Sequence, residues 1–231
     1  MFHPVDHPLK RGWVGRIDGE HVVQLAAQNL QAFFTGGASA REHAVYPLAG
    51  VYLLAPVLRP PSIRIFEDQH SFAFANPAAI MGQNSEVEHR AVDDWIRLNL
   101  YPRLAAIVGG NGEIAGFTIF ADWRAPELPA PKDRDFAFGL GPIVVTLDEA
   151  LAIPEAIVRV SDDEVLRSRF EGFDWRAAQA LAAEGTALSP GDVIAGPALG
   201  VVERIEPATV IELEVEGLGT LSQSVHPPVE L

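Results

Sequence analysis

Apolar and polar residues alternate in short runs along most of this chain, which predicts strands more often than helices. Apolar residues flank the Asp18-Gly19 dipeptide on both sides, so residues 12–25 are expected to form a tight hairpin. Residues 210–215 read VIELEV and predict a strand with one polar face. Further strands are expected at 51–58, 72–76, 104–108, 114–120, 143–145, 157–160 and 193–195.

Helical patterns are few. The longest runs from about Asp174 to Ala183, where Asp174 has the side chain of a good N-cap. A shorter helical turn is expected over residues 29–34, before two glycines. Residues 125–134 contain three prolines and are predicted to form an exposed loop. The predicted fold class is therefore α+β and mainly β.

The chain length suits one main domain. With 231 residues the chain can bury one substantial core. The Pro60-Pro61 dipeptide indicates a boundary, and the segment before it has too few apolar residues to bury a core alone. We therefore expect residues 1–59 to form a small N-terminal cap and residues 60–231 to form the main domain.

Charge and composition exclude several classes of protein. Asp and Glu number 31 against 17 Lys and Arg, so the formal net charge of −14 repels nucleic acid and anionic membrane surfaces. The chain has no cysteine, which excludes disulfides, thiol nucleophiles and thiolate metal sites. It shows no signal-peptide pattern and no apolar run of the ~18 residues that a spanning helix needs. A cytoplasmic location is expected.

Three stretches of the sequence carry a resemblance. Residues 60–82 contain PPSIRIFEDQH and FANPAAIMG, residues 116–146 contain GFTIFADWRAPEL and KDRDFAFGLGPIVVT, and residues 188–221 contain LSPGDVIAGPALG and VIELEVEGLGTL. Together these resemble motifs of the fumarylacetoacetate hydrolase superfamily. Its members cleave C–C bonds in β-dicarbonyl or acylpyruvate compounds, or isomerise or decarboxylate related oxo acids. The resemblance implies a β roll with few helices, a small oxo acid or dicarbonyl compound as partner, and a homodimer.

The superfamily holds Mg²⁺ with carboxylate ligands, and this chain departs from that pattern. The resemblance places Tyr101 and Arg103 where a Glu-x-Glu pair is expected, and Ser62 near an early acidic position. Asp122 alone stands as a metal-ligand candidate, and a single carboxylate is too few for a small, hard cation. We therefore expect no cofactor and little or no metal dependence. The Arg103 guanidinium is expected to pair with Asp122 and to supply positive charge in place of the ion.

The resemblance also implies roles for individual residues. His70 stands beside acidic residues, so a His-carboxylate pair is expected to activate water. Arg134 stands where the superfamily has a lysine that polarises the substrate. The implied catalytic residues are His70, Glu67 and Arg134. The implied substrate-binding residues are Arg103, Tyr101, Lys132 and Gly196.

Two functions remain open at this point. The first is an enzyme acting on a small oxo acid or β-dicarbonyl compound by C–C hydrolysis, decarboxylation or isomerisation. The second is a non-catalytic homologue that keeps the fold as a ligand-binding or partner subunit, in which Arg103 and Asp122 form only a structural ion pair. A slip in the strand register would instead offer other carboxylates as ligands, namely Glu86, Glu88, Asp93 and Asp94.

Overall fold

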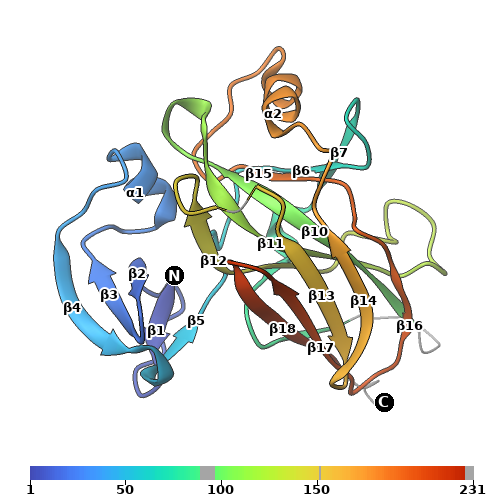
Figure 1. Ribbon diagram of the computed structural model, residues 1–231, viewed down its shortest axis with the longest axis horizontal. Coiled ribbons are helices and arrows are strands. Elements are labelled where there is room, and N and C mark those ends of the chain that lie inside the picture. The colour runs from blue at the N-terminus through green and yellow to red at the C-terminus, as the bar shows by residue number, and fades with distance from the viewer. Residues whose placement is uncertain (89–96, 151, 227–231) are drawn as a thin grey trace.

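The computed structural model describes residues 1–88, 97–150 and 152–226. Two long antiparallel strands, β10 (Leu98–Val108) and β11 (Ile114–Arg124), form the centre of the molecule (Figure 1). Both strands are buried on both faces over most of their length. The apolar run at residues 104–108 of β10 agrees with this, because a strand covered on two sides needs no polar face. The turn between them uses Asn111 and Gly112, both with positive φ.

An eight-stranded sheet curls around this pair in the order β7–β6–β15–β10–β11–β12–β8, with β16 also paired to β10. The sequence-distant strands β6 and β15 pair in parallel, so their carboxyl ends meet at one edge. The remaining members of this sheet are β6 (Ile63–Phe66), β7 (Phe72–Ala75), β8 (Ile80–Met81), β12 (Phe138–Thr146), β15 (Val193–Ala195) and β16 (Val202–Ile205).

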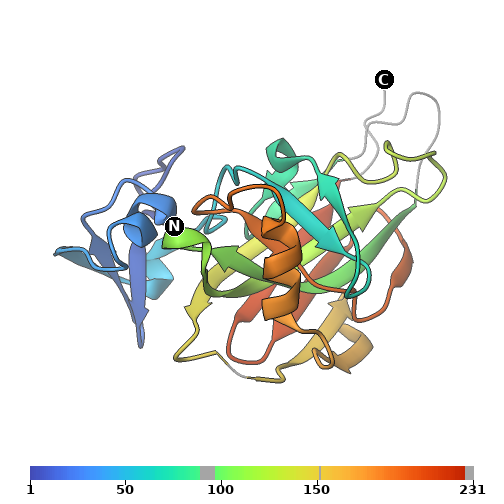
Figure 2. The ribbon, with the colours of Figure 1, turned by 90° about the horizontal axis from the view of Figure 1, so that it is seen from above.

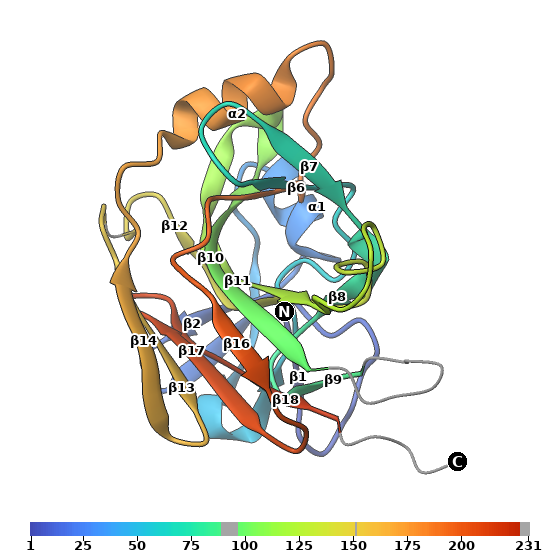
Figure 3. The ribbon, with the colours of Figure 1, turned by 90° about the vertical axis from the view of Figure 1, so that its right-hand side faces the viewer.

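A second sheet of five strands, in the order β14–β13–β17–β18–β9, packs beside the first (Figure 3). Apolar side chains of both sheets form one buried cluster that includes Trp123, Leu100 and Leu213. The strands of this sheet are β9 (Ser85–Val87), β13 (Glu155–Val160), β14 (Asp163–Arg169), β17 (Val210–Val215) and β18 (Gly219–Val225).

One helix covers the opposite side of the curled sheet. Helix α2 (Trp175–Ala183) lies across it (Figure 2), and its Ala178 and Ala182 pack in a cluster with Phe66 and Ile194. The Asp174 side chain accepts hydrogen bonds from two backbone N–H groups of the first turn. The predicted helix and its N-cap are therefore confirmed. In the part of the chain that the structure describes, no helix is long and apolar enough to cross a membrane.

The first 53 residues form two small sheets and one short helix, which lie to one side of the curled sheet (Figure 1). Phe34 and, just beyond this segment, Val57 nevertheless belong to the buried cluster that contains Ile63 and Ile107 of the main sheet. The elements here are β1 (Phe2–Pro4), β2 (Gly15–Asp18), β3 (His21–Leu25), α1 (Leu30–Thr35), β4 (Glu42–Pro47) and β5 (Val51–Leu53). Short 3₁₀ turns occur at Leu48–Gly50, Pro77–Ala79 and Gly110–Gly112. The boundary near Pro60 stays a prediction.

The predicted class, mainly β with few helices, is confirmed, and so are the hairpin over 12–25 and the helical turn over 29–34. Several strand predictions were wrong in extent: the strand expected at 114–120 continues to Arg124, and the strand expected at 143–145 begins at Phe138. Residues 51–58 form a strand only over Val51–Leu53, because Pro56 interrupts the apolar run that follows. The strand expected at 104–108 begins at Leu98, because buried polar residues of its first half find partners on other segments: Asn99 accepts from the Arg204 N–H, and Arg103 donates to Asp122.

Candidate functional site

Charged side chains from β10, β11 and the end of β6 meet in one network. Tyr101 stands directly opposite Asp122 in the β10–β11 register. Because side chains alternate along a strand, Arg103 and Arg124 point to the same face as this pair. Glu67 follows the last residue of β6 and approaches from the neighbouring side.

Arg103 lies at the centre of the network and is fully buried. Its Nε donates to Asp122 Oδ2 at 3.1 Å, and its Nη2 donates to Glu67 Oε2 at 2.8 Å. Its Nη1 donates to the carbonyl oxygens of Phe66 at 2.9 Å and Gly196 at 3.0 Å. Each guanidinium nitrogen is thus hydrogen-bonded inside the protein, which is the condition for burying a charge at tolerable cost.

Arg124 binds the same two carboxylates from the solvent side. Its Nη2 lies 2.7 Å from Glu67 Oε1 and 2.8 Å from Asp122 Oδ2. Its guanidinium stacks over the Tyr101 ring, 4.1 Å from the ring centre. Burial alone would lower the pKa of Arg124, but hydrogen bonds and charge from Asp122 and Glu67 raise it, so this side chain stays charged.

Arg134 reaches the network from the loop that follows β11. The loop returns to its start, where the Ala125 N–H donates to the Asp133 carbonyl at 2.7 Å. Arg134 Nη2 then lies 3.4 Å from Glu67 Oε1. Burial would raise the pKa of Glu67, but Arg103 and Arg124 outweigh that effect and lower it to about 2.

No family model matches the chain. A 2-dehydro-3-deoxy-D-arabinonate dehydratase of Saccharolobus solfataricus is 26% identical over 172 residues, which cover 65% of this chain and 56% of that protein. The chain therefore spans about half the length of this curated relative.

Solved structures match over nearly the whole chain. Fumarylacetoacetate hydrolase from Exiguobacterium antarcticum superposes with a TM-score of 0.81 at 21% identity, covering 94% of this chain and 96% of that one. Maleylpyruvate hydrolase from Sphingobium sp. SYK-6, in complex with manganese(II) and pyruvate, superposes with a TM-score of 0.79 at 21% identity, covering 94% and 97%. The chain has the fumarylacetoacetate hydrolase fold. A 5-carboxymethyl-2-hydroxymuconate delta-isomerase from Mycobacterium smegmatis shares this fold, with a TM-score of 0.76 at 24% identity and coverage of 93% and 94%.

The network of this fumarylacetoacetate hydrolase fold does not fit a divalent metal. Its two carboxylates, Glu67 and Asp122, already bind guanidinium groups, and three arginines surround them. Mg²⁺ requires six oxygen ligands and is repelled by neighbouring cations. Among the described residues, no group of three or more His, Cys, Asp and Glu side chains is placed to hold a metal ion. Asp122 Oδ1 is buried without a hydrogen-bond partner, but one free oxygen does not make a metal site.

The structure brings together four residues that the sequence indicated: Glu67, Arg103, Asp122 and Arg134. The ion pair expected between Arg103 and Asp122 is present. Tyr101 adjoins the group through Arg124. The roles assigned to these residues stay predictions.

Other predicted residues lie elsewhere or serve differently. The Lys132 side chain is 70% exposed and pairs with Asp135 at 2.7 Å. His70 is exposed. Its backbone N–H, rather than its imidazole, donates a hydrogen bond to Asp68 Oδ1 at 2.8 Å. Gly196 contributes its carbonyl oxygen to Arg103.

The remaining ligand candidates also fall outside the network. Ser62 donates to Asp192 Oδ1 at 2.6 Å in a separate buried cluster. Glu86 lies in β9, 3.6 Å from His226, and Glu88 follows that strand. Asp93 and Asp94 lie outside the described residues.

Arg124 was not among the site residues that the sequence indicated. The signal was available, because Arg124 follows Asp122 by two residues and would share its face if the strand continued. The expected end of that strand at residue 120 hid this relation, whereas β11 continues to Arg124.

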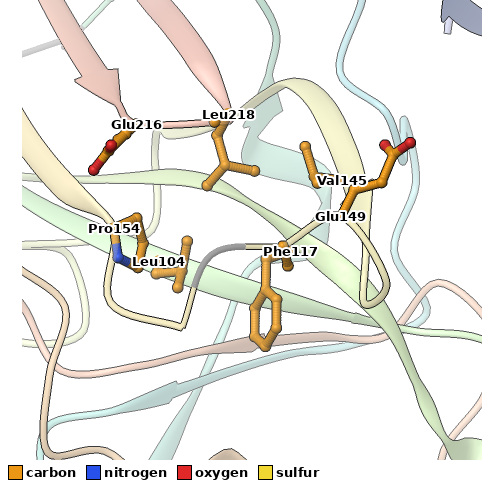
Figure 4. Close-up of a pocket in the computed structure, with 9 residues that line it drawn as sticks. Leu104, Phe117, Val145, Glu149, Pro154, Glu216 and Leu218 are labelled. Atoms are coloured by element: carbon orange, nitrogen blue, oxygen red, sulfur yellow. The ribbon is translucent and has the colours of Figure 1, made fainter.

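A separate small pocket lies on the other face of the β10–β11 pair (Figure 4). Leu104, which follows Arg103 and therefore points the opposite way, forms part of its wall. Of the described residues that line it, none belongs to the network. They are Leu104, Phe117, Val145, Glu149, Ala150, Pro154, Glu216, Gly217 and Leu218.

Proposed function

We propose that this protein is a member of the fumarylacetoacetate hydrolase superfamily that binds a small oxo acid or related dicarbonyl compound without a divalent metal. The observation that carries the proposal is the network in which three arginines surround Glu67 and Asp122 and pair with both carboxylates. The solved structures with this fold include hydrolases and an isomerase, one of them with pyruvate bound.

Two arginines are suited to hold a carboxylate ligand. The side chains of Arg124 and Arg134 are 16% and 22% exposed, whereas that of Arg103 is fully buried and hydrogen-bonded inside the protein. Arg134 Nη1 is buried without a hydrogen-bond partner, so it has a donor to offer. A guanidinium fork matches the geometry of a carboxylate. We therefore assign anion binding to Arg124 and Arg134, with Tyr101 beside them.

The chemistry of the network favours binding over the hydrolysis that metal-dependent members perform. A carboxyl whose pKa is lowered to about 2, as for Glu67, is a weak base near neutral pH. The arginines around it cannot act as acids or bases at this pH. Without a metal, a bound water is not activated by a Lewis acid.

A second candidate is a metal-independent enzyme acting on the same class of compound. Asp122 Oδ1 is buried without a partner, so it is an acceptor that a substrate hydroxyl or enol would satisfy. In this candidate His70, Glu67 and Arg134 keep the catalytic roles that the resemblance implies.

Calorimetry on metal-stripped protein separates metal-free from metal-dependent binding. Oxalate, a planar mimic of an oxo-acid enolate, is titrated in the presence of EDTA and then in the presence of Mn²⁺. We expect binding without metal, weakened at least ~10-fold by Arg134→Gln because one charge-assisted hydrogen-bonding fork is lost. Arg159→Gln removes an arginine from a pair with Glu214 outside the network and is the matched control. Binding that requires Mn²⁺ would contradict the proposal.

Turnover assays distinguish the two candidates. Acylpyruvates and 2-keto-3-deoxy acids are incubated with the protein in EDTA, and products are followed by chromatography. Turnover that is lost in Asp122→Asn while oxalate binding persists would establish the enzyme. Oxalate binding without turnover of either class of substrate supports the non-catalytic binding function.

The assembly and location of the protein belong to the same proposal. We propose a homodimer in the cytoplasm, in line with the sequence resemblance. Sedimentation velocity tests the dimer, and cell fractionation tests the location.

A further inference from the structure

The oxygens around Arg103 have an unusual origin. Residues Ile65 and Ala195 are paired in the parallel β6–β15 ladder, so Phe66 and Gly196 follow directly at its carboxyl end. Their carbonyl oxygens leave the ladder at the same place and both accept from Arg103 Nη1. Carbonyls at a strand end need another donor when they are buried. Here that donor is a cation.

Two carboxylates complete the enclosure. Asp122 Oδ2 and Glu67 Oε2 accept from Nε and Nη2 of the same guanidinium. Arg103 therefore sits in a cage of four oxygens, defined here as the Phe66 and Gly196 carbonyls with the Asp122 and Glu67 carboxylates. Asp122 and Arg103 are both fully buried, so water screens their ion pair little, whereas the Glu67 side chain is 48% exposed.

We propose that Arg103 is a built-in cation that closes a latent cation site and positions Glu67 and Asp122 for Arg124. The cage provides hard oxygen acceptors of the kind that bind a cation, and the chain fills it from within. This inference goes beyond the proposed function, because it holds whether or not an oxo acid binds. It predicts that the empty cage, made by truncation, takes up a free guanidinium compound.

Chemical rescue of Arg103→Ala tests the proposal. The variant lacks the guanidinium and leaves room for ethylguanidinium, which carries the same planar donors. We expect ethylguanidinium to raise the melting temperature of Arg103→Ala by about 5 °C, as a ligand specific for the native state does. The melting temperature of the wild-type protein should not rise, because Arg103 already occupies its cage. Tetramethylammonium at the same concentration has charge but no N–H donors, so it should rescue neither protein.

Matched measurements keep the test decisive. Arg159→Ala removes an arginine from a partly exposed pair with Glu214, where no cage exists, and should show no rescue. Equal stabilisation of Arg159→Ala and Arg103→Ala, or none of Arg103→Ala, would overturn the proposal. If Arg103→Ala does not fold alone, ethylguanidinium added during refolding should recover folded protein, and failure to do so overturns it equally.

Metal titration provides an independent result. Mg²⁺ or Mn²⁺ alone should leave the melting temperature of the wild-type protein unchanged, because Arg103 occupies the cage. If either ion stabilises the wild-type protein, the proposal that Arg103 is a built-in cation is overturned. Oxalate binding by the same sample tests the proposed function separately. The proposed function and the built-in cation can therefore fail independently of each other.

Discussion

At the scale of single residues, burial decides what each charge does. Arg103 is enclosed and hydrogen-bonded within the protein, so it acts on its neighbours rather than on solvent. Arg124 and Arg134 share the same carboxylates but keep part of their surface exposed. The same residue type thus serves as a fixed structural cation at one position and as a candidate ligand-binding group at two others.

Replacing Arg103 by Met should strongly destabilise the protein. Methionine has a similar length but no hydrogen-bond donors. The Phe66 and Gly196 carbonyls and one oxygen each of Asp122 and Glu67 would therefore lose a hydrogen bond. We expect the free energy of unfolding in urea to fall by about 3–5 kcal/mol. Arg159→Met, in the pair with Glu214 whose side chains are 30% and 43% exposed, should cost less than about 1 kcal/mol. Equal losses in the two variants would show that the Arg103 contacts contribute little.

The lowered pKa of Glu67 predicts how stability depends on pH. The folded protein holds this carboxyl at a pKa of about 2, below its ordinary value of 4.5, so the folded state favours the ionised form. Its stabilising contribution is present above pH 4.5 and is lost as the pH falls toward 2. Glu67→Gln should therefore flatten the decline of stability across this range. Urea unfolding measured at several pH values checks this, with Glu127→Gln in the exposed loop as the control.

At the scale of elements, strand alternation places the site. Tyr101, Arg103, Asp122 and Arg124 share one face because β10 and β11 pair in register. The opposite face carries Leu104 and packs against other apolar side chains. One hairpin thus supplies both the polar network and part of the core.

Helix α2 depends on its N-cap. Asp174 accepts hydrogen bonds at 3.0 Å from the backbone N–H groups of Arg176 and Ala177. Asp174→Ala should lower the free energy of unfolding by about 1 kcal/mol. In thermal unfolding followed by circular dichroism this corresponds to roughly 2–4 °C. Asp174→Ser keeps a capping oxygen and should recover most of the loss; if it behaves like Ala, the cap is not the cause.

At the scale of the whole molecule, the N-terminal segment and the curled sheet share a buried cluster. Phe34 and Val57 come from residues 1–59, and they pack with side chains of β6, β10 and β15. The predicted cap therefore covers apolar surface that the main sheet would otherwise expose.

A truncated chain of residues 60–231 should not fold stably. It would expose the apolar side chains that Phe34 and Val57 cover, among them Ile63 and Ile107. We expect loss of the cooperative thermal transition and aggregation in size-exclusion chromatography. A soluble fragment with a sharp transition would instead show that residues 60–231 are an independent domain.

The sequence by itself determined the fold class and much of the local structure. Alternation, the Asp18-Gly19 turn and the cap at Asp174 are local signals, and each acts within a few residues. The motif resemblance led to the correct fold and placed Tyr101, Arg103 and Asp122 near one another. It also predicted a degenerate metal site, which stays a prediction.

Only the tertiary structure decided which charges meet and which stay buried. The Phe66 and Gly196 carbonyls come together because two sequence-distant strands pair in parallel, which no local pattern reveals. The loop after β11 brings Arg134 to Glu67 but leaves Lys132 in solvent, although the two lie two residues apart. Burial and charge pairing are properties of the packed chain, because solvent is excluded only after distant segments come together.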